Sequence, residues 1–277
     1  QSFTLIELLV VIVIIGILSG LVVIATSSFI EKANFSKAQA FSSTIHKEML
    51  FSLVSEWTFD DGTNQAVNRI ATADDVKDSW GSNHGTVHGN PQVKGGDDCI
   101  FGRCLSFDGD DHIVIDMFVS GTEATISLWV KNPSGSYVLR SDANCRTYVR
   151  RNSFSKGDPL VSLGSASYSK DWNHAVITWK KENGQLKGKA FINGVPTQKD
   201  FKDFSDECNG TYITLMSFTR GGEQFASGTI DDVRYYNAVL STAEIKQNYI
   251  AGLDLMLKNG SLSKNEYNQR LQALANN

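Results

Sequence analysis

Residues 3–25 read FTLIELLVVIVIIGILSGLVVIA, and this apolar run is the strongest feature of the sequence. No charged residue lies between Glu7 and Glu31, so the run is long enough to cross a bilayer as a helix. A secretory signal peptide would begin with basic residues, and none precedes the run. A plain membrane anchor explains the hydropathy but leaves Glu7 at the apolar end, where a carboxylate requires a partner.

The helical pattern continues beyond the apolar run. Apolar residues recur at roughly helical spacing among charged ones, at Ala33, Phe35, Ala38, Phe41, Ile45, Met49 and Phe51. We therefore expect one long helix from about residue 3 to about residue 53. It is apolar first and amphipathic later, and it forms a first domain of residues 1–53.

From residue 54 onward the pattern changes to short alternating strands separated by Gly, Asn, Asp and Ser. Residues 125–130, 175–179 and 232–236 are examples, and Asn193-Gly194 marks a tight hairpin turn. This pattern predicts an antiparallel β-sandwich, with Trp57, Trp129 and Trp179 in its core.

The end of the chain is predicted to be a helical hairpin of residues 242–258 and 263–275. Ser263 and Glu266 have the spacing of a capping box at the second helix. The fold class is therefore α+β, with a long N-terminal helix, an antiparallel sandwich and a C-terminal helical hairpin.

Composition narrows the functional classes. Of the 277 residues, 41% are hydrophobic and 20% are charged, which excludes a fully disordered chain and a polytopic membrane protein. The net charge of −4 argues against nucleic acid as the main partner.

The run FTLIEL followed by an apolar helix resembles the N-terminus of type IV pilins and pseudopilins. The resemblance implies cleavage by a prepilin peptidase, N-terminal methylation, and a single pass through the inner membrane before assembly into an extracellular filament. It gives Glu7 the role of attracting the N-terminal amine of a neighbouring copy in the filament core. The family's mature chain starts at the phenylalanine, here Phe3, whereas this chain starts at Gln1. Cyclisation of Gln1 would remove the charge of the amine and weaken its pairing with Glu7.

A second resemblance covers residues 54–250, and residues 251–277 are then a C-terminal extension. Its segments are LVSEWTFDDG (53–62), DSWGSNHG (78–85), FGRCLSFDG (101–109), ISLWV (126–130), FING (191–194) and GTIDDVRYY (228–236). In order and spacing they are similar to concanavalin A-like, laminin G-like domains. The resemblance implies a jelly roll of two curved antiparallel sheets. Because this family contains lectins, adhesion modules and enzymes, the fold does not by itself settle the function.

Related domains often carry a structural calcium ion, and the matching positions here are Asp60, Asp78 and Asp231. Asp232 stays an alternative to Asp231, because neighbours in a strand face opposite sides of the sheet. Calcium takes about 6–8 oxygen ligands, which three carboxylates with carbonyls and water would supply. The alternative interpretation is that these aspartates cap turns by accepting backbone hydrogen bonds.

Catalysis is not expected. Hydrolases on this fold often carry two or three carboxylates as E-x-D-x-E on one strand, and that pattern is absent. Glycan binding without catalysis stays open. The candidate ligand surface is Trp80, in a polar loop, with Arg146, Arg150 and Arg151 in a cationic loop.

The four cysteines allow three pairings. In an extracellular protein an even number suggests two disulfides. Cys99 and Cys104 flank a predicted turn, so we expect them to pair, which leaves Cys145 with Cys208. A zinc site is the alternative, but one close pair and two distant cysteines fit it poorly.

These features predict a structural subunit, a major pilin, of a type IV pilus-like filament that displays the sandwich for adhesion or inter-subunit contact. Its partners are other copies of itself and the pilus assembly machinery, with glycans or cell surfaces as candidates for the sandwich. One alternative is a minor pilin or pseudopilin whose sandwich is a glycan-binding adhesin. Another, a membrane-anchored glycan-active enzyme, is disfavoured by the missing carboxylate pattern.

Overall fold

A computed structural model of the chain describes residues 12–13, 49–135, 137–141, 147–150, 153–156, 161–165, 170–197, 201–202 and 209–276. Contacts divide the chain into two compact units, residues 1–48 and residues 49–277. In the first unit only Ile12 and Val13 are described, and both are helical. The rest of the predicted N-terminal helix, including Gln1, Phe3 and Glu7, lies outside the described residues. Within the described part of the chain, no helix combines the length and hydropathy that a membrane span requires.

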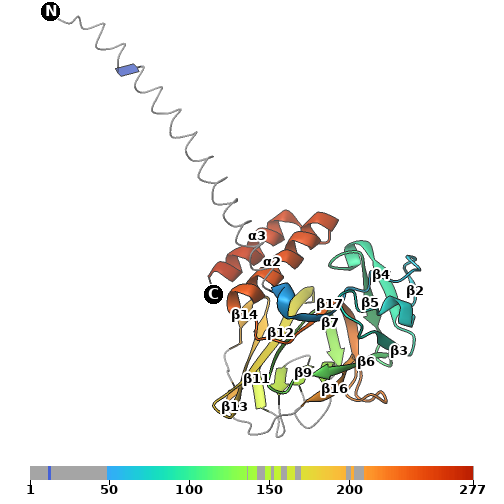
Figure 1. Cartoon of the computed structure of the whole chain (residues 1–277). Coiled ribbons are helices and arrows are strands. Elements are labelled where there is room, and N and C mark those ends of the chain that lie inside the picture. Colours follow the sequence, from blue (N-terminus) through green and yellow to red (C-terminus); the bar gives the residue numbers. More distant parts are fainter. Residues whose placement is uncertain are drawn as a thin grey trace, which may run out of the picture. The chain divides into compact units, whose positions relative to one another are not determined.

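The second unit is a sandwich of two antiparallel sheets (Figure 1). The larger sheet has the order β14-β13-β12-β7-β17-β5-β4-β2, and β1 pairs with β17 and β15 with β13. Its strands are β1 (Leu53–Trp57), β2 (Arg69–Ile70), β4 (Gln92–Gly95), β5 (Arg103–Phe107), β7 (Glu123–Gly135), β12 (Trp172–Glu182), β13 (Gln185–Ile192), β14 (Val195–Pro196), β15 (Phe201–Lys202) and β17 (Ala226–Tyr236).

The smaller sheet has the order β11-β10-β9-β8-β16-β6-β3. Its strands are β3 (Gly85–His88), β6 (His112–Val119), β8 (Tyr137–Ser141), β9 (Thr147–Arg150), β10 (Ser153–Lys156), β11 (Val161–Ser165) and β16 (Gly210–Leu215). Two short 3-10 helices, η1 (Ala73–Asp75) and η2 (Gly96–Asp98), interrupt the loops of the first half. The predicted antiparallel sandwich is therefore confirmed.

Local sequence accounts for the turns and for the core between the sheets. Asn193 and Gly194 both have positive φ, as a two-residue hairpin between β13 and β14 requires. Trp57, Trp129 and Trp179 are buried, as predicted. Two of these buried indoles also have a hydrogen-bond partner for their N–H group. Trp57 donates to the Asn83 carbonyl (2.8 Å) and Trp179 to the Ser120 carbonyl (2.9 Å).

Two helices close the chain, α2 (Thr242–Asn259) and α3 (Lys264–Ala275). They confirm the predicted hairpin, and Gly260 ends α2 in the left-handed conformation. The prediction of a capping box at Ser263 is confirmed for the N-cap and wrong for the reciprocal bond from Glu266. The Ser263 hydroxyl accepts from the Glu266 amide (3.2 Å), but the Glu266 carboxylate binds Arg270 (2.6 Å) one turn on instead of returning to the cap. The reciprocal capping box occurs at α2, between Ser241 and Glu244.

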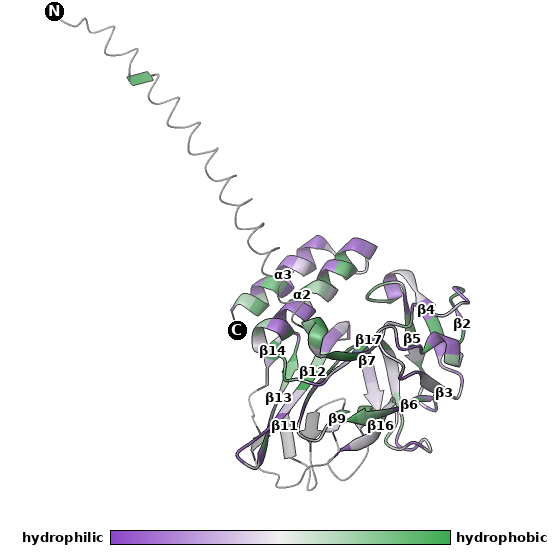
Figure 2. Cartoon of the chain, in the orientation of Figure 1, coloured by the Kyte–Doolittle hydropathy of each residue, from purple (hydrophilic) through white to green (hydrophobic). Residues whose placement is uncertain are grey.

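The helices cover part of the outer face of the larger sheet. A second core forms there from Trp129 and Trp172 of the sheet with Tyr249, Leu253 and other residues of the helices. Gly252 permits the close approach, since a Cβ at this position would lie 2.1 Å from the Trp129 ring. Figure 2 shows hydrophilic and hydrophobic residues mixed along both helices, as expected for elements with one buried face. A domain boundary at residues 250/251 would cut α2 in two, so the helical pair belongs with the sandwich.

Candidate functional site

A polar groove crosses the part of the larger sheet's outer face that the helices leave uncovered. Ser106 of β5 pairs with Thr229 of β17, which also pairs with Lys131 of β7. Their chain neighbours Leu105, Ile230 and Val130 point into the sandwich core. Because successive side chains in a strand face opposite sides, the polar residues line the outer face.

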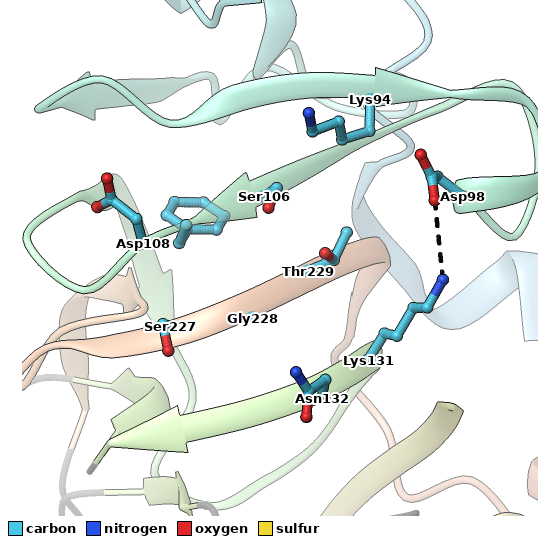
Figure 3. Close-up of a pocket in the computed structure, with 10 residues that line it drawn as sticks. Lys94, Asp98, Ser106, Asp108, Lys131, Asn132, Ser227, Gly228 and Thr229 are labelled. Atoms are coloured by element: carbon cyan, nitrogen blue, oxygen red, sulfur yellow. Dashed lines mark ion pairs between the residues drawn. The ribbon is translucent and has the colours of Figure 1, made fainter. Parts of the chain in front are cut away.

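The groove has a volume of about 460 Å³ and contains hydroxyl, ammonium, carboxylate and amide groups. Ser106, Ser227 and Thr229 provide hydroxyls at its centre. Figure 3 shows Lys94, Lys131 and Asp98 toward one end and Asp108 at the other. The remaining lining residues are Phe107, Asn132 and Gly228.

A β-bulge shapes the floor of the groove. The register between β17 and β7 shifts between Ser227 and Thr229, around Gly228. Gly228 has a φ of 135°, and a Cβ there would lie 2.9 Å from the Lys131 carbonyl oxygen. Asn132 is also in the left-handed region, with a φ of 48°. Only glycine permits so close an approach at position 228, so the floor of the groove depends on it.

The edge of the groove that carries Asp98 is braced from several sides. Cys99 and Cys104 form a disulfide directly after η2, as predicted. The Asn259 side chain, at the end of α2, donates to the carbonyls of Cys99 (3.1 Å) and Ile100 (2.9 Å). This bracing places Asp98 4.0 Å from the Lys131 ammonium. Cys145 and Cys208, the second predicted pair, lie outside the described residues.

A second, smaller pocket of about 80 Å³ brings together two of the three predicted calcium ligands. Asp60 and Asp231 line it, together with Asp232 and Arg234. Asp231 is buried and accepts from the Ile100 amide (2.9 Å), while Asp60 accepts from the Arg103 amide (2.6 Å). Asp232 has an ion pair with Arg234 (2.9 Å).

Asp78 does not take part in this pocket. Its carboxylate accepts from the backbone amides of Glu56, Trp80, Gly81 and Asn83 at 2.8–3.1 Å. The ligand atoms of Asp60, Asp78 and Asp231 therefore form no compact group in the described part of the chain. The turn-capping alternative describes Asp78, because a carboxylate with four backbone donors is already satisfied.

The protonation of these carboxylates follows from their surroundings. Burial raises the pKa of Asp60 to about 6, although the Arg103 amide opposes the rise. Burial and the neighbouring Asp232 raise the pKa of Asp231 well above its usual range. Burial alone would also raise the pKa of Asp78, but the amides of Gly81, Glu56 and Asn83 hold it below its usual value. The negative charges of Asp60 and Asp231 are therefore poorly compensated, whereas backbone hydrogen bonds compensate the charge of Asp78.

Comparisons with known proteins fit this architecture. The sequence profile described as the concanavalin A-like lectin/glucanases superfamily matches residues 107–246, half of the chain. The chain belongs to this superfamily. A prokaryotic N-terminal methylation motif matches residues 1–23. This motif is characteristic of type IV pilins, which assemble into extracellular pili after membrane insertion, so the two matches together fit a pilus-type surface protein.

Solved structures resemble this concanavalin A-like domain in fold alone. Domain 4 of AbnA, a GH43 extracellular arabinanase from Geobacillus stearothermophilus, solved in complex with arabinotriose, has a TM-score of 0.53 and 18% identity, over 74% of this chain and 98% of that one. The botulinum neurotoxin serotype D ligand binding domain, solved in complex with N-acetylneuraminic acid, has a TM-score of 0.52 and 15% identity, over 76% of this chain and 53% of that one. The binding domain of Paraclostridial Mosquitocidal Protein 1 has a TM-score of 0.51 and 14% identity, over 74% and 52%. No curated protein matches the sequence.

The predicted ligand surface of the concanavalin A-like domain is only partly described. Trp80 is at the surface, with 49% of its area exposed. Arg150 packs over the ring of Tyr137, with its guanidinium carbon 4.4 Å from the ring centroid. Arg146 and Arg151 lie outside the described residues. Arg150 therefore contributes to an aromatic stack rather than projecting as a free cation.

A buried charge network in the same domain escaped the sequence analysis. Asp75 of η1 accepts from Arg69 at 2.6 and 2.8 Å and from Arg103 at 3.3 Å. The backbone amide of Thr72 also donates to Asp75 (2.8 Å). Asp75 and Arg103 are 1% and 4% exposed. No local pattern marks these residues, because their charges meet only after separate loops and strands have folded together.

Proposed function

We propose that this chain is the structural subunit, a major pilin, of an extracellular type IV pilus-like filament. Its N-terminal helix forms the filament core, and its concanavalin A-like domain is displayed at the filament surface. The observation that carries the proposal is the methylation motif at residues 1–23 on a chain whose residues 49–277 form a separate compact unit. A filament core and a displayed domain require this division of the chain.

Replacement of Glu7 tests the proposal. In the Glu7→Ala variant, the N-terminal amine of a neighbouring subunit has no carboxylate to bind in the apolar filament core. We expect filaments to be absent or severely reduced in electron micrographs of sheared cells, while immunoblots find the chain in the membrane. Glu31→Ala is the matched control, because it removes the same charge beyond the apolar run, and it should assemble normally. Normal filaments from Glu7→Ala would contradict the assembly role.

A minor pilin that acts as a glycan-binding adhesin is the second candidate. It is favoured by the two structural neighbours solved with saccharide ligands, arabinotriose and N-acetylneuraminic acid. Mass spectrometry of sheared filaments separates the candidates. Filaments made chiefly of this chain support the major pilin, and filaments in which it is rare support the adhesin.

We further propose that the pocket at Asp60 and Asp231 holds a structural calcium ion. Carboxylate and backbone oxygens are the ligands that calcium prefers. Two acidic residues whose pKa values are raised by burial would gain a counter-charge from the ion. Asp232 lines the same pocket but is ion-paired with Arg234 (2.9 Å), so Asp60 and Asp231 would hold the ion together with backbone carbonyls and water.

Calcium removal tests that site. Calcium at about 100 times its dissociation constant would add about 2.7 kcal/mol to the free energy of unfolding, or about 5–10 °C in Tm. We expect the Tm of the full chain in detergent to fall by this amount on chelation. The Asp60→Asn variant should lose the response to calcium, and the exposed Asp171→Asn should keep it. An identical Tm with calcium and with chelator would refute the site.

A further inference from the structure

The polar groove on the larger sheet has an uneven charge distribution along its length. Lys94, Lys131 and Asp98 stand toward one end, which therefore carries one net positive charge, and Asp108 stands at the other (Figure 3). The centre carries hydroxyls, from Ser106 and Thr229, and no carboxylate. A ligand that matches this groove has an anionic group at one end and hydroxyl groups at the other.

Both lysines are available to such a ligand at low cost. The Lys94 ammonium donates to the neutral side-chain oxygen of Asn68 (3.3 Å). The ion pair of Lys131 with Asp98 spans 4.0 Å and is partly exposed, so it contributes little to stability. A ligand carboxylate at this end of the groove would replace these weak contacts with charge-assisted hydrogen bonds.

The lining also indicates how the ligand is held. The groove volume of about 460 Å³ is within the range of small-molecule sites. Phe107 is its one aromatic lining residue among those described, and the side chain is buried. Ring stacking therefore contributes little, and hydrogen bonds and charge must supply the recognition. Hydroxyl, amide, carboxylate and ammonium groups in one groove are suited to the many hydroxyls of a sugar.

We propose that this groove binds an acidic saccharide of one or two sugar residues. The sugar carboxylate binds at the end of the groove that carries Lys94 and Lys131, its hydroxyls contact Ser106 and Thr229, and Asp108 accepts from a hydroxyl at the far end. The display of this groove on a filament rests on the proposed function. Binding of the saccharide requires only the folded domain.

Binding of defined oligosaccharides to the full chain in detergent tests the proposal. Isothermal titration calorimetry would use digalacturonate and sialic acid as two sources of a sugar carboxylate, and maltose as the neutral probe. We expect at least one acidic probe to bind about tenfold or more tightly than maltose. Its affinity should fall as the salt concentration rises, because the attraction is between charges. Whichever acidic probe binds identifies the source of the carboxylate.

Variants of the two lysines locate the site. Lys94→Gln and Lys131→Gln should each weaken acidic-probe binding about tenfold. Lys180→Gln is the matched control, since Lys180 is an exposed lysine of the same sheet with an ion pair to Glu123 (3.9 Å). It should bind like the unmodified chain. Equal Tm values for the three variants would confirm that they are folded.

Three outcomes would overturn the proposal. These are no binding of either acidic probe, equal binding of acidic and neutral probes, and binding that neither lysine variant weakens. Electron microscopy of filaments from the same variants keeps the two hypotheses apart. A chain that assembles without binding contradicts the groove alone, and a chain that binds without assembling contradicts the filament role alone.

Discussion

Replacement of Asp75 by Ala should cost about 3–5 kcal/mol of the free energy of unfolding, which is typical when one partner of a buried ion pair is removed. Asp75 is buried between Arg69 and Arg103 and also accepts from the Thr72 amide. Its removal leaves the guanidinium of Arg103, which is 4% exposed, without a carboxylate. Urea denaturation of the full chain in detergent should show a lower midpoint with an unchanged slope.

A surface pair of the same chemistry provides the control. Asp116 makes a two-pronged ion pair with Arg220, but its side chain is 60% exposed. Asp116→Ala should therefore cost less than about 1 kcal/mol, because water solvates the arginine that remains. Equal losses for Asp75→Ala and Asp116→Ala would show that burial of the network is not what makes it important.

Acidification should destabilise the domain through His174. The ring of His174 is buried against the rings of Trp129 and Tyr249, with centroid distances of 5.0 and 6.3 Å. Burial lowers the pKa of His174 to about 3, and the charge of Arg234 adds to this effect. In the unfolded chain, the pKa of His174 returns to the ordinary value for a histidine. Between pH 6.5 and 3 the unfolded state therefore binds more protons than the folded state.

Stability from this histidine is present in full above pH 6.5 and is lost as the pH falls toward 3. A single group with this shift removes about 2 kcal/mol between pH 6.5 and about pH 4.5. Urea denaturation at several pH values measures the loss. His174→Phe keeps an aromatic ring but cannot be protonated, so its stability should fall by about 2 kcal/mol less over the same range. Parallel pH profiles of the two proteins would rule out His174 as the source.

The features that the sequence predicted correctly are those specified by neighbouring residues. Asn193-Gly194 forms its hairpin turn because both residues tolerate positive φ. Ser263 caps α3 through the amide three residues later. Cys99 and Cys104 are close enough along the chain that one turn brings them together. Each of these features depends on fewer than about ten consecutive residues.

The candidate sites were harder to predict, because their residues come from distant segments. Asp78 matched a calcium ligand by its position in the sequence, but three amides of its own loop and the amide of Glu56 in β1 satisfy the carboxylate. Asp232, which the sequence left as an alternative to Asp231, lines the pocket together with Asp60 and Asp231. The local sequence does not reveal which of two adjacent carboxylates points into a shared pocket, because neighbours in a strand face opposite sides.

By itself, the sequence determined the division into an apolar N-terminal segment and a β-rich domain, and which side of many strands faces the core. These follow from hydropathy and from two-residue alternation, both of which are local properties. Only the tertiary structure decided that Lys94, Ser106, Thr229 and Lys131 share one groove, because the sheet places β4, β5, β17 and β7 side by side in an order unlike that of the chain. The physical reason is that strand order is selected by the packing of the whole core, to which every strand contributes at once.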